Sequence, residues 1–170
     1  MYSIRYGTVD DVSNIEQIIE RAWLKSNISI DEKQNILQSL IKLYPKDQII
    51  SEIQNQVQFY LLLTEEDMPM AFVSYSISDT CPADFRIHKI YSLPESQGKG
   101  YEKILIAKVE QIAIEHGGDL LFIYLKGRNN KTEYFEVLGF SPWNKKKIVD
   151  ENLTNENIMY KKLDYSDSCT

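Results

Sequence analysis

The sequence has 170 residues, of which 43% are hydrophobic and 26% charged, a composition that suits one globular domain with an ordinary core. Its formal net charge is -6, and the short run Lys145–Lys147 is its clearest basic feature, so we expect no nucleic-acid partner. No apolar run approaches the roughly 20 residues needed to cross a bilayer, and the first residues lack the apolar core of a signal peptide, so we expect no membrane association.

The N-terminal part predicts one strand followed by three helices. Thr8 and Asp11 resemble a capping box ahead of apolar residues at helical spacing, and Pro45 is suited to the first turn of a later helix. The expected elements are a strand over 2–6, a helix over 12–22, a helix from 30 to 43, and a helix after Pro45.

The rest of the chain alternates strands and helices. The apolar run Leu120–Leu125 is typical of a strand in a parallel sheet, and with the preceding strand and helix it forms a βαβ unit. The expected elements are strands over 58–64 and 71–78 joined by a hairpin at 65–69, a strand over 85–92, a helix from about 101 to Gly117, a strand over 120–125, a helix over about 130–138, and strands near 140–149 and 157–163. We therefore predict a single mixed α/β domain over 1–163 and a disordered tail over 164–170.

Two cysteines, Cys81 and Cys169, lie far apart in the sequence. They form neither a CxxC pair nor a disulfide framework, which favours a reducing cytoplasmic compartment and gives no sign of a metal site. We expect a cytoplasmic protein, as a monomer or homodimer, that uses no metal.

The segment from Lys89 to Tyr101 predicts an anion-binding turn. It places a strand end, a short loop and the glycines Gly98 and Gly100 directly before a helix. The first N–H groups of a helix have no internal acceptor, and glycine lets a phosphate approach them closely. No GK[ST] of a P-loop occurs, and Lys103 stands where a dinucleotide-binding fingerprint needs its third glycine.

Two segments resemble the GNAT N-acetyltransferases. Gln97–Glu102 resembles the family's Q/R-x-x-G-x-G/A pyrophosphate loop, and Asn130 followed by Tyr134–Phe140 resembles its "N…FYEKLGF" helix and strand. The sequence of residues 88–100 resembles the corresponding segment of bacterial polyamine acetyltransferases. The resemblance implies a GNAT fold, with a central mixed sheet whose parallel strands splay apart between flanking helices.

The resemblance also implies a set of acetyl-CoA-binding residues. The pantetheine arm would pair with the strand ending at Ile90, Tyr91 and Ser92, and Asn130 would bind near the thioester. The pyrophosphate would be held by Gln97, Gly98, Lys99, Gly100, Tyr101 and Glu102. Glu102 departs from the motif, because the family has Gly or Ala there, and we expect its side chain to point outward.

No catalytic group is fixed by the sequence. The family's acid tyrosine corresponds to Phe135, so its neighbour Tyr134 is only a weak candidate, and a packed structural role is favoured for it. A structural role is also favoured for His88 and a surface role for His116. The carboxylates Asp31, Glu32 and Asp84, and the aromatic residues Trp23, Tyr44 and Tyr75, are further candidates for an acceptor site, although most such residues are solvated or core.

These features predict an acetyl-CoA-dependent N-acetyltransferase whose acceptor is a small-molecule amine, such as a cationic polyamine, that attacks the thioester directly. Two alternatives stay open. One is a CoA-binding or sensing module without turnover, and the other is an acetyltransferase that acts on protein N-termini or lysines.

Overall fold

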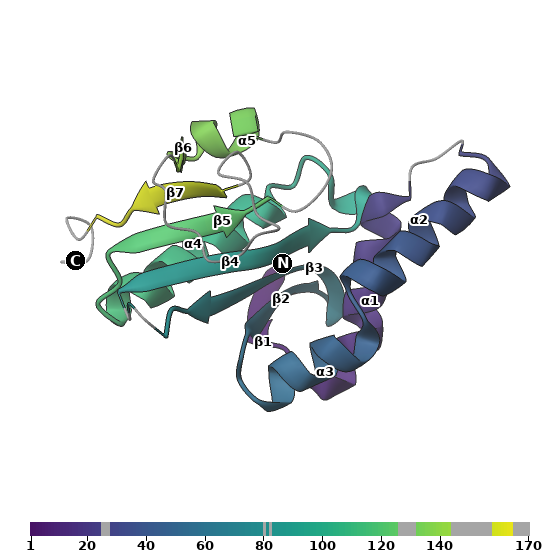
Figure 1. Cartoon of the computed structure of the whole chain (residues 1–170), viewed down its shortest axis with the longest axis horizontal. Helices are drawn as coiled ribbons and strands as arrows, with labels where there is room; N and C mark the ends of the chain where they lie inside the picture. The colour runs from purple at the N-terminus through teal and green to yellow at the C-terminus, as the bar shows by residue number, and fades with distance from the viewer. Residues whose placement is uncertain (25–27, 80, 82, 126–131, 144–157, 165–170) are drawn as a thin grey trace. The chain divides into compact units, whose positions relative to one another are not determined.

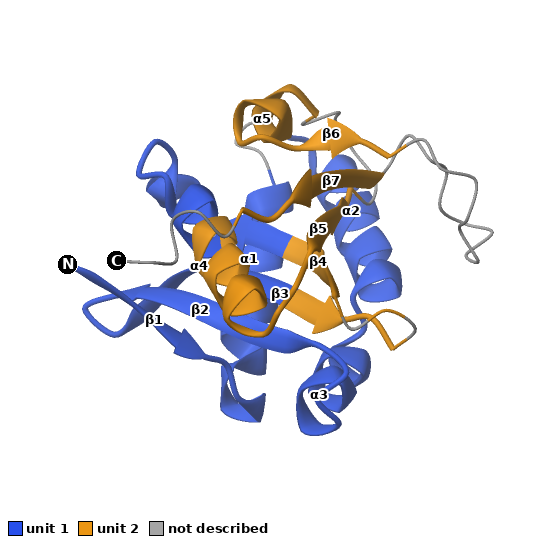
Figure 2. Cartoon of the chain, turned by 90° about the vertical axis from the view of Figure 1, so that its left-hand side faces the viewer, with its two compact units in different colours: residues 1–74, 90–105 blue, residues 75–89, 106–170 orange. Residues whose placement is uncertain are grey.

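The computed structural model describes residues 1–24, 28–79, 81, 83–125, 132–143 and 158–164, and its contacts group into two compact units. The first unit comprises residues 1–74 and 90–105, and the second comprises 75–89 and 106–170 (Figure 2). The chain passes between the units several times. The domain boundary at 163 and the disordered tail stay predictions, and residues 165–170 lie outside the described part.

The elements follow the predicted order along the chain (Figure 1). They are β1 (Tyr2–Tyr6), a 3-10 turn (Val9–Asp11), α1 (Val12–Trp23), α2 (Ile30–Leu43), α3 (Lys46–Gln54), β2 (Phe59–Glu65), β3 (Met68–Ile77), β4 (Asp84–Ser92), a second 3-10 turn (Pro94–Ser96), α4 (Tyr101–Glu115), β5 (Leu120–Tyr124), α5 (Thr132–Val137), β6 (Ser141–Pro142) and β7 (Ile158–Lys162).

The strands form one mixed seven-stranded sheet with the order β1-β2-β3-β4-β5-β7-β6. β4 and β5 are parallel, from the pair Asp84–Leu120 to the pair Ile87–Ile123, whereas β5 and β7 are antiparallel. The predicted mixed fold with a parallel β4–β5 pair is therefore confirmed. β4 continues to Ser92, beyond the residues paired with β5.

In the first unit, α1, α2 and α3 bury one apolar face each in a common core. α1 begins after the capping box of Thr8 and Asp11, as its sequence predicts, and α2 begins after a capping box formed by Ser29 and Glu32. Each box satisfies N–H groups that a helix start leaves unpaired. These helices share the core with β2, β3 and the start of the turn after β4. It contains Val12, Ile15, Ile18, Ile19, Ile36, Leu40, Tyr44, Ile49, Tyr60, Leu62, Phe72 and Leu93.

In the second unit, the apolar run of β5 is buried, as expected for an inner strand with a neighbour on each side. Leu121 and Ile123 are almost completely inaccessible, with exposed fractions of 0% and 1%. The aromatic rings of Phe122, Trp143 and Tyr160 pack edge to face with centroids about 5 Å apart, which connects β5 and β7 to the residue after β6.

The hairpin between β2 and β3 is tighter than the sequence suggested. Met68 and Pro69, expected in the loop, belong to β3, and the turn consists of Glu66 and Asp67. Both turn residues have positive φ, 47° and 64°, which suits the twist of a two-residue hairpin. Neither is glycine or asparagine, so the usual sequence signal for such a turn was missing.

Other boundaries differ by one or a few residues. Leu125 lies beyond the end of β5, and α5 ends at Val137, one residue before the predicted end, while residues 130 and 131 lie outside the described part. β6 covers only two residues of the predicted strand at 140–149, of which 144–149 lie outside the described part.

Candidate functional site

The predicted anion-binding turn lies within the first unit, between the end of β4 and the start of α4. The N–H of Gln97 donates to the carbonyl of Pro94 at 3.1 Å, and the N–H of Lys99 donates to the carbonyl of Ser96 at 3.0 Å. The N–H of Ile104 then donates to the carbonyl of Gly100 at 3.0 Å, which makes Gly100 the N-cap residue of α4. The backbone N–H groups of the first turn of α4 have no carbonyl acceptor inside the helix, and they carry its positive dipole end.

Both glycines of the turn adopt a conformation that other residues rarely take. Their φ angles are +86° at Gly98 and +73° at Gly100, and a Cβ built at either position would meet no atom within 4 Å. The backbone at the helix start is therefore open to an approaching group. Ser96, immediately before the turn, is buried, and its Oγ has no hydrogen-bond partner within the described structure. Open backbone donors together with an unpaired hydroxyl fit a phosphate group.

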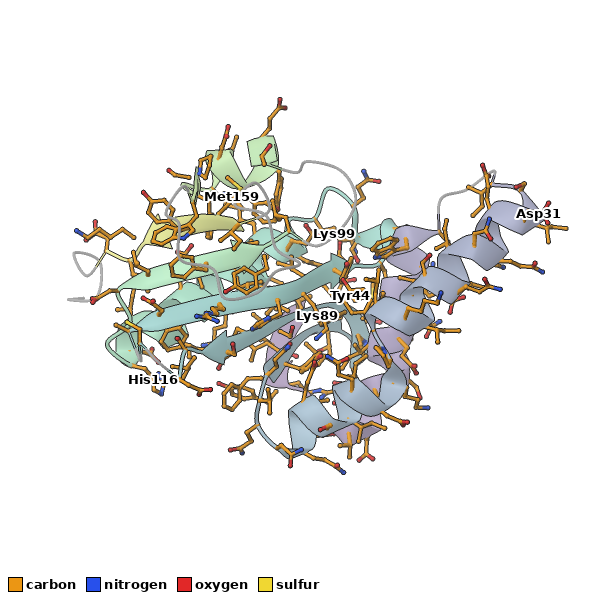
Figure 3. All side chains as sticks on the ribbon, viewed as in Figure 1. Asp31, Tyr44, Lys89, Lys99, His116 and Met159 are labelled. Atoms are coloured by element: carbon orange, nitrogen blue, oxygen red, sulfur yellow. The ribbon has the colours of Figure 1, made fainter. Side chains whose placement is uncertain are left out.

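The side chains of Lys99 and Tyr101 do not extend freely from the turn. Nζ of Lys99 lies 3.0 Å from both carboxylate oxygens of Glu65 at the end of β2, and the hydroxyl of Tyr101 donates to the same carboxylate (Figure 3 labels Lys99). The hydrogen bond from Tyr101 and the ammonium of Lys99 lower the pKa of Glu65. The hydrogen bond to Glu65 in turn raises the pKa of Lys99 and of Tyr101. No local pattern could indicate Glu65, because its contact with Lys99 joins residues 34 positions apart.

Glu102 does not point outward as expected. Its side chain is half-buried, and its carboxylate accepts a hydrogen bond of 3.2 Å from Oγ of Ser92 at the end of β4. The donor is the hydroxyl of the serine at the strand end. The negative charge therefore lies beside Ser92, one of the residues predicted to bind the cofactor.

The side chains of the last three residues of β4 alternate between the two faces of the strand. Tyr91 points into the core of the first unit, where its hydroxyl hydrogen-bonds to that of Tyr44 at 2.8 Å and also to the side chain of Trp23. Burial raises the pKa of Tyr91 and of Tyr44. Ile90 and Ser92 occupy the opposite parity of the strand and are half-buried. The side chain of Tyr91 is therefore occupied in the core, so only the backbone of this residue could contact a cofactor.

The two residues weighed as a catalytic acid differ in environment, both on α5. Phe135 has an exposed fraction of 1% and packs against Phe140, whereas Tyr134 is 39% exposed with its ring edge-on to that of Phe135. The expected difference in helix face is confirmed. Asn130 lies outside the described residues, so its predicted role near the thioester stays a prediction.

The remaining candidates have mostly structural surroundings. His116 is exposed at the end of α4, and its Nδ1 hydrogen-bonds to the carbonyl of Ile112 at 2.7 Å, which confirms the predicted surface role. His88 is half-buried, with Nε2 2.7 Å from Oγ of Ser76 and its ring edge-on to that of Tyr124.

Two of the aromatic candidates, Tyr44 and Tyr75, are buried in the core, and Trp23 is half-buried. Of the carboxylates, Asp31 and Glu32 are exposed in the first turn of α2, and Asp84 is half-buried at the start of β4. None of the three is therefore singled out as a base.

Comparison with known proteins identifies the class to which this fold and turn belong. Residues 20–140 match the model of the acetyltransferase (GNAT) family, which spans most of the chain. The chain therefore belongs to the GNAT acetyltransferase family, a family of acyltransferases that use acetyl-CoA. No curated protein matches the sequence.

Solved structures with the same fold share little sequence with the chain. PaiA N-acetyltransferase from Thermoplasma acidophilum, in complex with coenzyme A, is 18% identical, with a TM-score of 0.72 and coverage of 95% of this chain and 99% of that one. The ribosomal-protein-S18-alanine N-acetyltransferase of Escherichia coli is 17% identical, with a TM-score of 0.66 and coverage of 96% and 94%. N-acetylglutamate synthase from Neisseria gonorrhoeae is 18% identical, with a TM-score of 0.65 and coverage of 95% and 33%. At such identities the likeness shows the fold alone.

The described residues also bear on two other classes of site. None of the helices that they form is long and apolar enough to cross a membrane. Within the same residues, no group of three or more His, Cys, Asp and Glu side chains is placed to hold a metal ion.

Proposed function

We propose that this protein binds acetyl-CoA at the turn 97–102 and transfers the acetyl group to a small cationic amine. The observation that carries the proposed site is the pair of glycines with positive φ at the start of α4, with open space in front of both. A pyrophosphate has the size and charge to accept hydrogen bonds from the backbone donors there. The half-buried hydroxyl of Ser92 and the backbone of Ile90 and Tyr91 would face the pantetheine arm, and Asn130 would complete the site.

A cationic acceptor is supported by charge. The chain has a formal net charge of -6, which favours the encounter with cations. Within the first unit, the carboxylate of Glu102 lies beside the end of β4. A carboxylate at this position would attract an ammonium group. The resemblance of residues 88–100 to bacterial polyamine acetyltransferases favours polyamines among the cationic amines.

The chemistry we propose is direct transfer without a covalent enzyme intermediate. The activated acetyl group comes with acetyl-CoA, and the protein has to orient the thioester and admit a deprotonated amine. Backbone donors beyond the end of the paired part of β4 would stabilise charge on the carbonyl oxygen during attack.

An amine panel tests the acceptor. Polyamines, free amino acids, aminoglycosides and peptides with free N-termini or lysines are each incubated with acetyl-CoA and the full-length protein, and release of free thiol is measured. We expect the highest kcat/KM with polyamines. Turnover with a peptide and with none of the small amines would refute the small-molecule acceptor and favour a protein acetyltransferase.

A further inference from the structure

We propose that Glu65 is a positioning residue for the phosphate-binding turn. Its carboxylate holds Lys99 and Tyr101, the residues on either side of Gly100, and so fixes the direction of the backbone N–H groups at the start of α4. This inference rests on the proposed function, because it assigns a role to Glu65 in the affinity of the turn for CoA.

The sheet holds Glu65 firmly in place. It is the last residue of β2, and its Cα is paired with that of Tyr2 in the antiparallel register of β1 and β2. Its side chain is 28% exposed, so its carboxylate is partly shielded from water. Charge-assisted hydrogen bonds in such a position are stronger than those on the open surface.

Both neighbours of Gly100 are attached to this carboxylate. Lys99 makes 3.0 Å contacts with both oxygens, and its Nζ also lies 5.6 Å from the centroid of the Tyr101 ring. Tyr101 is the first residue of α4, is only 6% exposed, and packs its ring 6.1 Å from that of Tyr2. Tyr101 is thus attached to the edge of the sheet by its ring and by its hydroxyl.

Gly100 itself has little that could fix its orientation. It lacks a side chain, and the space where a Cβ would lie is empty to 4 Å. Glycine also loses more backbone freedom on ordering than any other residue. The direction of its N–H and of the next N–H groups therefore depends on how firmly residues 99 and 101 are held. A turn that is already ordered binds its ligand without a further loss of entropy.

Simple electrostatics predicts the opposite effect for the same residue. The carboxylate of Glu65 neutralises Lys99, so its removal would free one cation and take away one anion near the proposed phosphate site. If charge alone mattered, loss of Glu65 would tighten CoA binding. If Glu65 positions the turn, its loss weakens binding, so the sign of the change distinguishes the two.

The main experiment is calorimetric titration of CoA into the full-length wild-type protein and its variants. We expect Glu65→Ala to raise Kd about 10-fold and Glu65→Gln to raise it about threefold, because the amide oxygen still accepts from Tyr101. Glu66→Gln is the matched control, since Glu66 is exposed in the adjacent turn and carries the same charge. It should leave Kd within about twofold of the wild-type value.

A shortened ligand separates positioning from a general loss of structure. Pantetheine lacks the pyrophosphate, so its affinity should be the same for the wild type and for Glu65→Ala, whereas a distorted fold would weaken both ligands. Tyr101→Phe keeps the buried ring and removes only the hydroxyl, and we expect it to raise the Kd for CoA about threefold. If Glu65→Ala does not fold, the Kd values of Tyr101→Phe and Glu65→Gln for CoA test the positioning role.

The outcomes are distinct. Unchanged or tighter CoA binding in Glu65→Gln and Tyr101→Phe would overturn the positioning role while leaving the binding site intact. Equal weakening of CoA and pantetheine would also overturn it. A wild-type protein that does not bind CoA would refute the proposed function itself, before any variant is compared.

Discussion

The glycine turn and helix α5 were both predicted as parts of one cofactor site, yet they differ in how their geometry arises. At the turn, the backbone itself is the proposed binding group, and two glycines with positive φ determine it locally. On α5, the function would depend on which side chain faces the reaction, and Phe135 occupies the buried face while Tyr134 is partly exposed. A binding site formed by backbone groups can therefore be predicted from the sequence. A site formed by side chains depends also on helix orientation and packing.

The largest expected effect is on stability, at α5. Replacing Phe135 with Ala removes a ring that is 1% exposed and packed against Phe140, and it should lower the free energy of unfolding by about 3–5 kcal/mol. Tyr134→Ala, at the next position on the same helix, should lower it by less than about 1 kcal/mol because that ring is partly solvated. Urea unfolding of both variants measures the difference. Equal losses would show that the two faces of α5 are not distinguished by burial.

The next effect is on binding, at the turn. Gly100→Val puts a branched side chain in the open space before the helix and strains a φ of +73°, so we expect the Kd for CoA to rise about 100-fold. Gly117→Val is a matched control at the opposite end of α4, with a φ of +75° and equally open space. It should lose similar stability and retain CoA affinity. Calorimetry on both folded variants tests the site, and unchanged affinity in Gly100→Val would refute it.

The accuracy of the sequence predictions follows the same division. Capping boxes, the apolar run of β5 and the glycines are local signals, and they located α1, β5 and the turn. The hairpin between β2 and β3 was predicted, but its two-residue turn at Glu66 and Asp67 was not, because the Asn-Gly or Asp-Gly pair that usually indicates such a turn is absent. The contact of Glu65 with Lys99 and the contact of Glu102 with Ser92 depend on the tertiary arrangement, so no local pattern could indicate them.

A smaller effect is expected from Glu102, with opposite signs for the two substrates. Glu102→Gln removes a negative charge beside the turn, so the Kd for CoA should fall about fivefold, an electrostatic change of roughly 1 kcal/mol. If the same carboxylate attracts the acceptor, the KM for a polyamine should rise by a similar factor. Glu95→Gln, also just before the turn but exposed and paired with Arg21, is the comparison variant. A rise in both constants would mean that Glu102 acts through structure and not through charge.

The effect that is smallest relative to what the chemistry of the residue could contribute is expected at Tyr134. A general acid that protonates the departing thiolate contributes roughly 10²–10⁴-fold to the rate. The position that the family uses for this purpose is Phe135, which has no proton to give and is buried against Phe140. Tyr134 is 39% exposed and lies about 100° away around the helix from that position. We expect water to protonate the thiolate instead. We therefore expect Tyr134→Phe to lower kcat by less than about 10-fold, with KM for acetyl-CoA unchanged.

The measurement is steady-state thiol release with the best acceptor from the amine panel, with Tyr124→Phe on β5 as a second tyrosine variant. A drop of about a hundredfold or more in kcat, confined to Tyr134→Phe and without a change in KM, would identify Tyr134 as the acid and would show that α5 presents this face to the thioester.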